Sequence, residues 1–258
     1  MKKRNLYFLI GTLIIVLVGG YFINKKYYPT PSVLSSPQVS PSATISSPSP
    51  LPSSSTTPKE SPTPTAKTIP SSYLIDNFPF QPQAPFANWD QLHDEACEEA
   101  AVILVNFWNE GHSTISAQTM DDEILKMVDW EIKNWGSHKD LTVKETVSMA
   151  KSFYGLSLRS EYDISLEDIK KEVSQDHPVI VPTAGRLLGN PYFRQPGPIY
   201  HMLVVIGYNG NTMIVQDIGT KRGDHYQYNV QVLLNAIHDW TGNPETIEQG
   251  KKVMLVLE

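Results

Sequence analysis

The only cysteine of this chain, Cys97, is the residue whose type and place suggest chemistry most directly. It stands at the start of an apolar stretch with helical spacing. A lone thiol forms no internal disulfide, so a stapling role is excluded. At a helix N-terminus the backbone lowers a thiol pKa and makes the sulfur nucleophilic. We therefore expect a nucleophile with a lowered pKa; the alternative is a small apolar core residue.

A cysteine nucleophile needs a base, a group that orients the base, and donors for the oxyanion. His201 opens an apolar run after a Gly/Pro-rich loop, which predicts an imidazole at the rim of a sheet, suited to act as the base. Asp217 ends the next apolar run and can accept from that imidazole. Gln91, six residues before Cys97, is the predicted side-chain oxyanion donor, beside the Cys97 N–H. The structural alternatives are a core histidine, a turn aspartate and a capping or exposed glutamine.

The turn between the two apolar runs sets a geometric condition on this hypothesis. An Asn-Gly pair between apolar runs is typical of a β-hairpin. A two-residue turn at Asn209-Gly210 would pair His201 with Ile218, and Asp217 would then point to the opposite face of the sheet. We therefore predict a three-residue loop or a β-bulge in this hairpin, because either would bring His201 and Asp217 to one face.

The elements that must position these residues change along the chain from helices to strands. Helical spacing and capping signals predict helices that start near Asp94, Met120, Thr142 and Ser165. Apolar, β-branched runs then predict strands over residues 178–183, 201–208, 212–217 and 252–257, with a short leading strand over 72–80 and a short helix over 230–239. Helices followed by an antiparallel sheet predict an α+β domain.

Several motifs around these residues resemble one known family. They are residues 82–89 ahead of the glutamine, Glu98-Glu99-Ala100 after the cysteine, Gly207-Tyr208 after the histidine, and residues 216–223. Together they resemble the C39-like peptidases over most of residues 75–240. The resemblance implies the papain-like cysteine protease fold. By position it also implies Cys97 as nucleophile, His201 as base, Asp217 as orienting group and Gln91 as oxyanion donor.

Two departures from the family pattern concern the surroundings of the site. Many members have Asp-Cys-Gly where this chain has Ala96-Cys97-Glu98, and Ile218 stands where proline is common. The transporter-linked members cut double-glycine leader peptides and carry an ATPase. This chain has no P-loop, so we expect neither that substrate nor an ATPase partner.

The N-terminal part of the chain has a composition of its own. Residues 6–23 are 18 uncharged, largely apolar residues between basic flanks, which predicts a membrane-spanning helix in an anchor over residues 1–28. A cleaved signal peptide is the alternative. Residues 29–70 hold 11 of the 20 prolines and three charged residues, which predicts a disordered linker. The folded domain is then residues 71–258, and the basic start favours its placement outside the cytoplasm of a single-pass protein.

Charge and composition restrict the partners of the predicted domain. Residues 71–258 contain 14 Lys and Arg against 26 Asp and Glu, a net charge of −12. This excess disfavours nucleic acid, which needs a basic patch. The histidines lack metal-ligand spacing and one cysteine cannot form a thiolate zinc site, so we expect no metal and no cofactor. The expected partners are a peptide or protein substrate and, through the N-terminal helix, the membrane.

The sequence therefore predicts a membrane-anchored, extracytoplasmic bacterial cysteine peptidase that cleaves peptide bonds through Cys97, His201 and Asp217. A catalytically inactive domain that binds peptide or cell-wall material would share these signals apart from competent geometry. An amide- or acyl-transfer enzyme could use the same three residues.

Overall fold

The structure of the chain is a computed structural model that describes residues 68–258. The predicted anchor at residues 1–28 and nearly all of the predicted linker at 29–70 lie outside the described residues. Between residues 68 and 258, no helix has the length and apolar character needed to cross a bilayer. The described residues belong to one compact unit.

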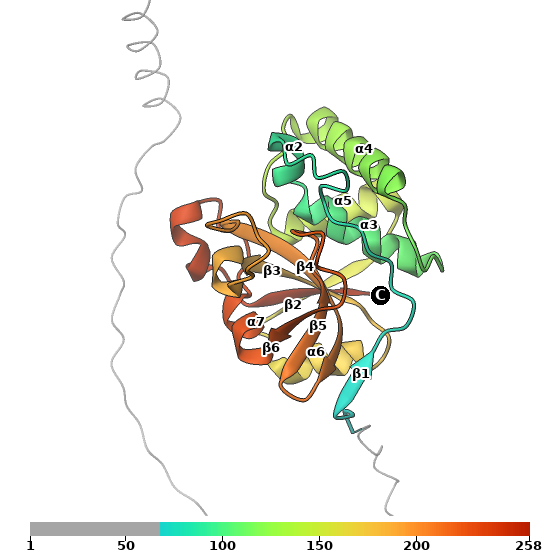
Figure 1. Cartoon of the computed structure of the whole chain (residues 1–258). Helices are drawn as coiled ribbons and strands as arrows, with labels where there is room; N and C mark the ends of the chain where they lie inside the picture. The colour runs from blue at the N-terminus through green and yellow to red at the C-terminus, as the bar shows by residue number, and fades with distance from the viewer. Residues whose placement is uncertain (1–67) are drawn as a thin grey trace, which may run out of the picture. The chain divides into compact units, whose positions relative to one another are not determined.

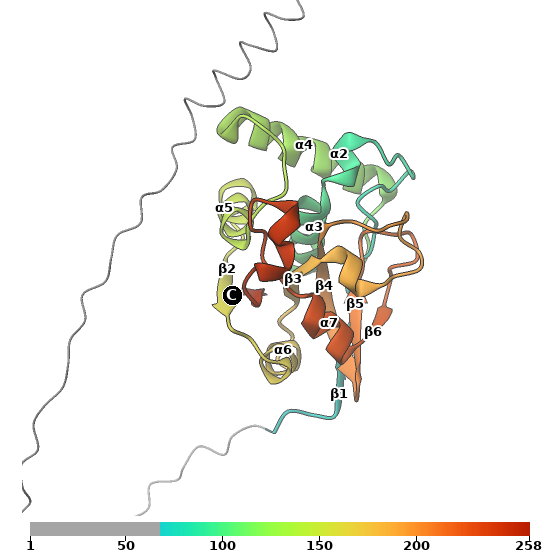
Figure 2. The ribbon, with the colours of Figure 1, turned by 90° about the vertical axis from the view of Figure 1, so that its left-hand side faces the viewer.

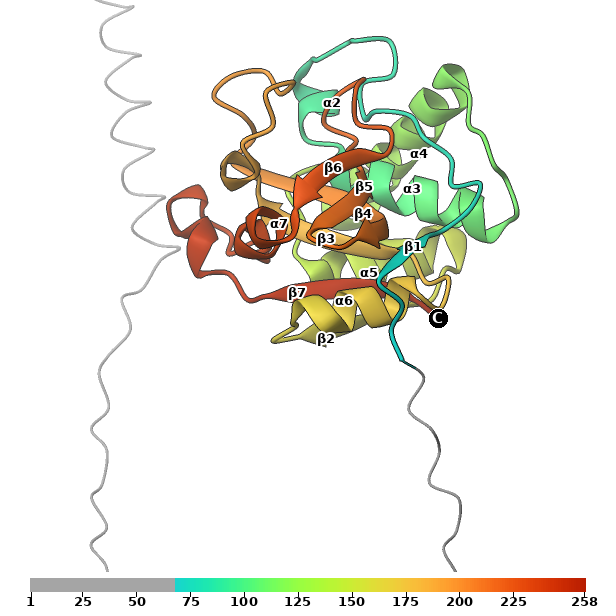
Figure 3. The ribbon, with the colours of Figure 1, turned by 60° about the horizontal axis from the view of Figure 1, so that its bottom comes forward.

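The centre of the unit is an antiparallel sheet with the order β2-β7-β3-β4-β5-β6, which can be followed in Figure 3. Figure 2 shows β3, β4, β5 and β6 side by side. β4 is the longest strand, and β1 pairs with the end of β4 that β3 does not reach (Figure 3). The strands are β1 (Ser72–Leu74), β2 (Leu158–Tyr162), β3 (Val179–Ala184), β4 (Tyr200–Asn209), β5 (Thr212–Gln216), β6 (Tyr226–Asn229) and β7 (Val253–Leu257).

Three long helices form a group that adjoins the sheet in Figure 1. Its central member, α3, is buried at its first ten positions between α4, α5 and β4. The helices are α2 (Gln91–Asp94), α3 (Cys97–Asn109), α4 (Ala117–Trp135), α5 (Val143–Tyr154), α6 (Leu166–Val173) and α7 (Val230–Ala236), with 3-10 turns η1 (Gly185–Leu188) and η2 (Pro244–Gln249). The prediction of an α+β domain with a mainly antiparallel sheet is confirmed.

Local capping explains where several helices begin. Thr142 and Ser165 each accept a hydrogen bond from the third helical N–H, and the acidic residue at that position bonds back, so both helices start with a capping box. The predicted helix near Asp94 is instead divided. Asp90 caps the short α2, the chain turns at Glu95, and α3 starts only at Cys97.

The hairpin between β4 and β5 contains the predicted irregularity. Asn209 pairs with Thr212, so the two-residue turn lies at Gly210-Asn211, one position later than expected. The register then shifts between Val205 and Gly207, which is a β-bulge at Ile206. The prediction of a bulge is confirmed, and the alternative of a three-residue loop is not needed.

The bulge decides which way Asp217 points. On the side of the bulge toward His201, Val204 pairs with Gln216, so the next residue of the chain, Asp217, lies opposite Leu203. Leu203 is two residues from His201 and lies on the same face of the sheet, so Asp217 and His201 also share that face. Without the bulge, the turn's register would place Asp217 opposite Val204 and on the other face.

The first strand supports the bulge from its other side. The Ile75 N–H donates to the Ile206 carbonyl over 2.8 Å, and Leu74 pairs with Gly207. A Cβ at Gly207 would lie 2.7 Å from the Tyr73 carbonyl oxygen, so only glycine allows this close approach. The short β1 therefore holds the extra residue of β4 in place.

Candidate active site

Cys97 is the first residue of α3, and its side chain is buried with 3 % exposure. The Cys97 thiol donates to Glu98 Oε2 over 3.0 Å, and the Met202 N–H donates to Cys97 Sγ over 3.3 Å. The first N–H groups of a helix have no partner within the helix, so the Cys97 N–H is available to a ligand. The sulfur thus lies beside the peptide group that follows His201.

The electrostatic environment of Cys97 is the reverse of the one expected from its helix position. Burial raises the pKa of the Cys97 thiol well above its usual value, and the carboxyl group of Glu98 raises it further. Burial also raises the pKa of Glu98, with Glu99 adding to the effect. The expectation of a lowered thiol pKa is therefore wrong for this conformation, because desolvation outweighs the helix N-terminus. The Cys97 thiol is therefore protonated near neutral pH.

His201 lies near the start of β4, where its imidazole forms part of the lining of a cleft. Phe193 packs edge-on against the ring at a centroid distance of 5.4 Å. The backbone at Gly219 passes so close that a Cβ there would lie 3.0 Å from the ring Cε1. Thr183 on β3 donates to the His201 carbonyl over 2.8 Å and fixes the backbone. The imidazole is therefore confined to one orientation.

Asp217 holds the far nitrogen of that imidazole. Its Oδ1 lies 2.9 Å from His201 Nε2 and accepts from the Gly219 N–H over 3.1 Å. Its Oδ2 accepts from the Tyr228 hydroxyl over 2.5 Å and from Asn190 Nδ2 over 2.9 Å. The fully buried carboxylate is thus satisfied at both oxygens.

These bonds also settle the charge of the carboxylate. Burial alone would raise the pKa of Asp217, but the bonds from His201, Tyr228 and Asn190 hold it below the ordinary value of 3.8. An ionised Asp217 accepts the proton of Nε2, so the neutral His201 ring presents the lone pair of Nδ1 on its other side.

The structure brings His201 and Asp217 together, but Cys97 is not hydrogen-bonded to the imidazole. Among the bonds that the described residues make, the partners of the Cys97 sulfur are Glu98 and the Met202 N–H. Because Met202 directly follows His201 in β4, the sulfur lies beside the backbone of His201, while its proton points to Glu98. A rotation about the Cα–Cβ bond of Cys97 is the change that would redirect the thiol.

The structure does not support Gln91 as a donor at this site. Gln91 is the exposed first residue of α2 and does not line the cleft. The buried Gln83 does line it, and its Nε2 donates to the carbonyls of His93 and Asp94 over 2.8 and 3.2 Å. Gln91 lies away from the cleft because Asp90 caps the short α2 at this point and Gln91 begins that helix on its exposed side.

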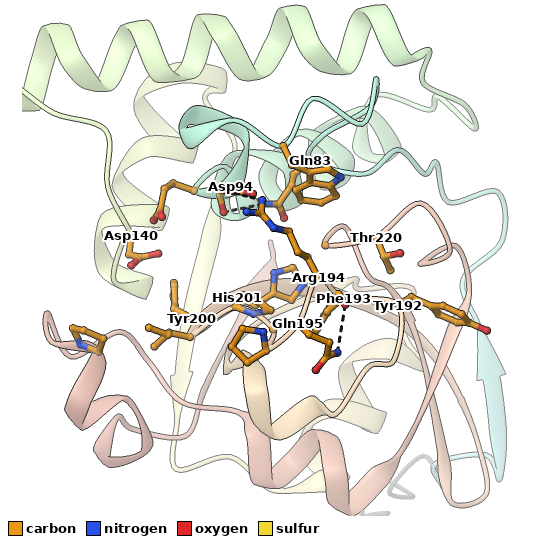
Figure 4. Close-up of a pocket in the computed structure, with 18 of the residues that line it drawn as sticks. Gln83, Asp94, Asp140, Tyr192, Phe193, Arg194, Gln195, Tyr200, His201 and Thr220 are labelled. Carbon is orange, nitrogen blue, oxygen red and sulfur yellow. Dashed lines mark hydrogen bonds and ion pairs between the residues drawn. The ribbon is translucent and has the colours of Figure 1, made fainter.

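A cleft of about 890 Å³ opens over His201 between the segment that precedes α3 and the connection from β3 to β4 (Figure 4). Its walls carry opposite charges. One side has the carboxyl groups of Asp94, Glu95 and Asp140, and the other has Arg194, Lys221 and Arg222. Such a cleft has room and polar groups for a peptide.

One ion pair spans this cleft. Arg194 Nη1 lies 3.6 Å from Asp94 Oδ2, and both side chains are largely exposed (Figure 4). Exposed pairs of this kind contribute about 0–1 kcal/mol, so a ligand can displace it at little cost.

Sequence reasoning missed four residues that surround the predicted ones. Glu98 and Gln83 lie within motifs that carried the family resemblance, so their positions were marked but their contacts were not. Asn190 and Tyr228 come from a loop and a short strand without a recognisable pattern. Only the folded chain brings them to Asp217.

Comparisons with known proteins place the described unit beside one family of peptidases. Residues 75–243 match the model of the Peptidase_C39 like family. A crystal structure of a candidate C39-like peptidase from Bacillus anthracis is similar, with a TM-score of 0.48 and 14 % identity over 72 % of this chain and 98 % of that chain. No curated protein matches the sequence.

Replacing Tyr228 by Phe tests the network around Asp217. Loss of a bond to a buried charge should lower the free energy of unfolding by about 1.5–3 kcal/mol near neutral pH. Because the folded-state pKa of Asp217 is depressed, its contribution is present above the unfolded value and is lost as pH falls through the folded one. In denaturant titrations, the difference in free energy of unfolding between wild type and Tyr228→Phe should therefore shrink below pH 3.8.

Tyr226→Phe is the matched control for this titration, because the neighbouring Tyr226 does not bond to Asp217. A deficit for Tyr228→Phe that stayed constant down to the acid range would show that the hydroxyl does not act through the charge of Asp217.

Replacing Glu98 by Gln tests the environment of the thiol. With its raised pKa, wild-type Cys97 should react with iodoacetamide at a rate that still increases with pH above neutrality. Glu98→Gln removes the carboxyl and offers an N–H to the sulfur, so alkylation near neutral pH should be faster. Glu110→Gln, at the far end of α3, should leave the rate unchanged. A wild-type rate that levels off in the acid range would instead indicate a thiolate paired with imidazolium.

Proposed function

The chain belongs to the Peptidase_C39 like family, and on that premise we propose that it is a cysteine peptidase with Cys97 as nucleophile, His201 as base and Asp217 as orienting group. The observation that carries the proposal is the 2.9 Å bond from His201 Nε2 to a buried, fully satisfied Asp217. It leaves Nδ1 of a confined imidazole as the free base, and the N–H of the next residue, Met202, bonds to the sulfur of the only thiol.

The proposed reaction begins when a peptide enters the cleft and the Cys97 thiol turns from Glu98 to His201. His201 Nδ1 takes the thiol proton as the sulfur attacks the peptide carbonyl carbon. The tetrahedral intermediate collapses, the C–N bond breaks, and His201 returns the proton to the leaving amine. A water molecule, deprotonated by the same nitrogen, then hydrolyses the thioester and restores the thiol.

The negative oxygen of the intermediate needs two donors. The Cys97 N–H is one, since it lies at an unpaired helix N-terminus. We assign the second to Gln83 in place of Gln91. Its amide is held in the wall of the cleft by the two carbonyls that precede Cys97, and the longer of these bonds, to Asp94, is the one to be exchanged for the oxyanion.

One observation favours a second function. The thiol is buried and bonded to Glu98 rather than to His201, which is what a peptide-binding domain without catalysis would display. A non-catalytic domain would hold a peptide in the same charged cleft. The two functions differ in the reactivity of Cys97, so they can be separated by experiment.

The test measures cleavage of a peptide library and labelling by a thiol-directed peptidyl probe. Cys97→Ser and His201→Ala should each abolish both signals, because they remove the nucleophile and the base. Gln83→Ala should lower kcat by about 10²–10³-fold, the usual effect of losing one oxyanion donor.

Gln91→Ala is the matched control for Gln83→Ala and should retain wild-type turnover. Thermal unfolding of each variant establishes that it is folded. Cleavage that survives in His201→Ala would contradict the mechanism. Peptide binding by wild type and by Cys97→Ser, with no cleavage and no labelling, would support the binding function instead.

We also propose that the domain works outside the cytoplasm, held to the membrane by residues 6–23. The support is the sequence, since 18 uncharged residues suffice to cross a bilayer as a helix. In a bacterial host the full chain should remain with the membrane after carbonate extraction. Protease added to intact cells should remove residues 71–258. Replacing Leu13 and Val16 by Lys should release the chain, and a wild-type chain in the soluble fraction would contradict the proposal.

A further inference from the structure

A second cluster of ionisable side chains lies behind the cleft, outside the machinery described so far. Glu99 comes from the first turn of α3, Glu131 from α4, and His138 from the loop that follows α4. Each side chain offers one ligand atom, and these atoms all lie within 4.8 Å of one another. His138 Nε2 is 3.0 Å from Glu99 Oε1.

The cluster is buried and its polar atoms lack partners. Glu99 is 1 % exposed and Glu131 is 0 % exposed, while the side chain of His138 is 11 % exposed. All four carboxyl oxygens and His138 Nε2 have no partner in hydrogen-bonding geometry. Among the ion pairs of residues 68–258, neither carboxyl group meets a lysine or an arginine.

Such an arrangement is costly unless something neutralises it. An uncompensated buried charge costs several kcal/mol, and unsatisfied polar atoms add to the penalty. Burial raises the pKa of both Glu99 and Glu131, so a shared proton is one way to relieve the repulsion. A proton shared between the two carboxyl groups would occupy one oxygen of each and leave the other two without a donor, whereas a cation would engage all three side chains.

We propose that Glu99, Glu131 and His138 bind a Zn²⁺ ion. Carboxylate oxygens and an imidazole nitrogen are both donors that zinc accepts, whereas Ca²⁺ and Mg²⁺ take oxygen ligands in larger number. Tetrahedral zinc with bonds of about 2.0–2.2 Å needs ligand atoms about 3.4 Å apart, so this cluster has only to contract slightly.

A bound ion at this position would connect the start of α3 to neighbouring elements of the fold. Glu99 is two residues after Cys97, so a bound ion would fix the first turn of α3 to the end of α4. The loop that contains His138 also carries Asp140, which lines the cleft. The ion would therefore stabilise the wall behind the thiol without touching a substrate. This inference does not depend on the proposed peptidase activity.

The experiment uses the full chain with Cys97→Ser, which removes the thiol as a competing zinc ligand. After treatment with a chelator, ZnCl₂ is titrated in by calorimetry while thermal unfolding is followed in parallel. We expect one Zn²⁺ per chain and a midpoint of unfolding that increases with the zinc concentration. Glu131→Gln and His138→Gln, each added to this background, should weaken binding at least about tenfold and remove most of the stabilisation.

The matched control is His177→Gln, which disrupts another His–Glu pair, with Glu172, in which the histidine is hydrogen-bonded. It should bind Zn²⁺ like the parent. Circular dichroism of the metal-free proteins shows whether Glu131→Gln folds. If it does not, His138→Gln decides alone, since this loop residue is not part of a helix.

Two results would overturn the proposal. The first is the absence of stoichiometric Zn²⁺ binding by the parent. The second is binding and stabilisation that persist in both variants, which would locate the ion elsewhere. A carboxyl pair that only shares a proton would give the first result, together with a Glu131→Gln protein at least as stable as its parent.

Discussion

The hydrogen bond between His201 and Asp217 depends on one extra residue in β4. The turn at Gly210-Asn211 alone would leave the two side chains on opposite faces of the sheet, because side chains alternate along a strand. The bulge at Ile206 reverses that parity. It persists because β1 bonds to the Ile206 carbonyl and because Gly207 permits the close approach of Tyr73. A three-residue strand thus helps to determine the geometry of a site far along the chain.

The buried ionisable groups of the site are stabilised in two different ways. Asp217 remains ionised because four donors, from His201, Gly219, Tyr228 and Asn190, replace the water it has lost. Cys97 and Glu98 have fewer donors, and burial raises the pKa of both groups. In the proposed mechanism, the imidazole of His201 is already oriented as the base in the resting site, whereas the thiol of Cys97 is still in its neutral form. The first step of that mechanism is therefore a movement of the thiol away from Glu98 and the Met202 N–H, to which the resting sulfur is bonded.

Much of this fold could be predicted from local patterns, since capping boxes at Thr142 and Ser165 and the apolar runs of β3, β4 and β5 are encoded by neighbouring residues. The existence of a bulge followed from a parity requirement, but its position did not. That position depends on β1, more than a hundred residues away. Gln91 was predicted from its spacing to Cys97 along the chain, but the short α2 lies between the two residues and leaves Gln91 exposed. The raised pKa of the Cys97 thiol was not predicted because burial against β4 has a larger effect on this pKa than the helix N-terminus. The residues that neighbour Cys97 in the sequence do not indicate that burial.

The tautomer of His201 is the most direct test of whether the bulge brings Asp217 to the imidazole. It can be measured by long-range proton–nitrogen NMR correlations at a pH where the ring is neutral. We predict a ring that carries its proton on Nε2, with a strongly deshielded N–H signal that disappears in Asp217→Asn. A neutral ring protonated on Nδ1, or an Nε2 proton indifferent to Asp217→Asn, would show that the bulge does not turn the carboxylate toward the imidazole and would contradict the account.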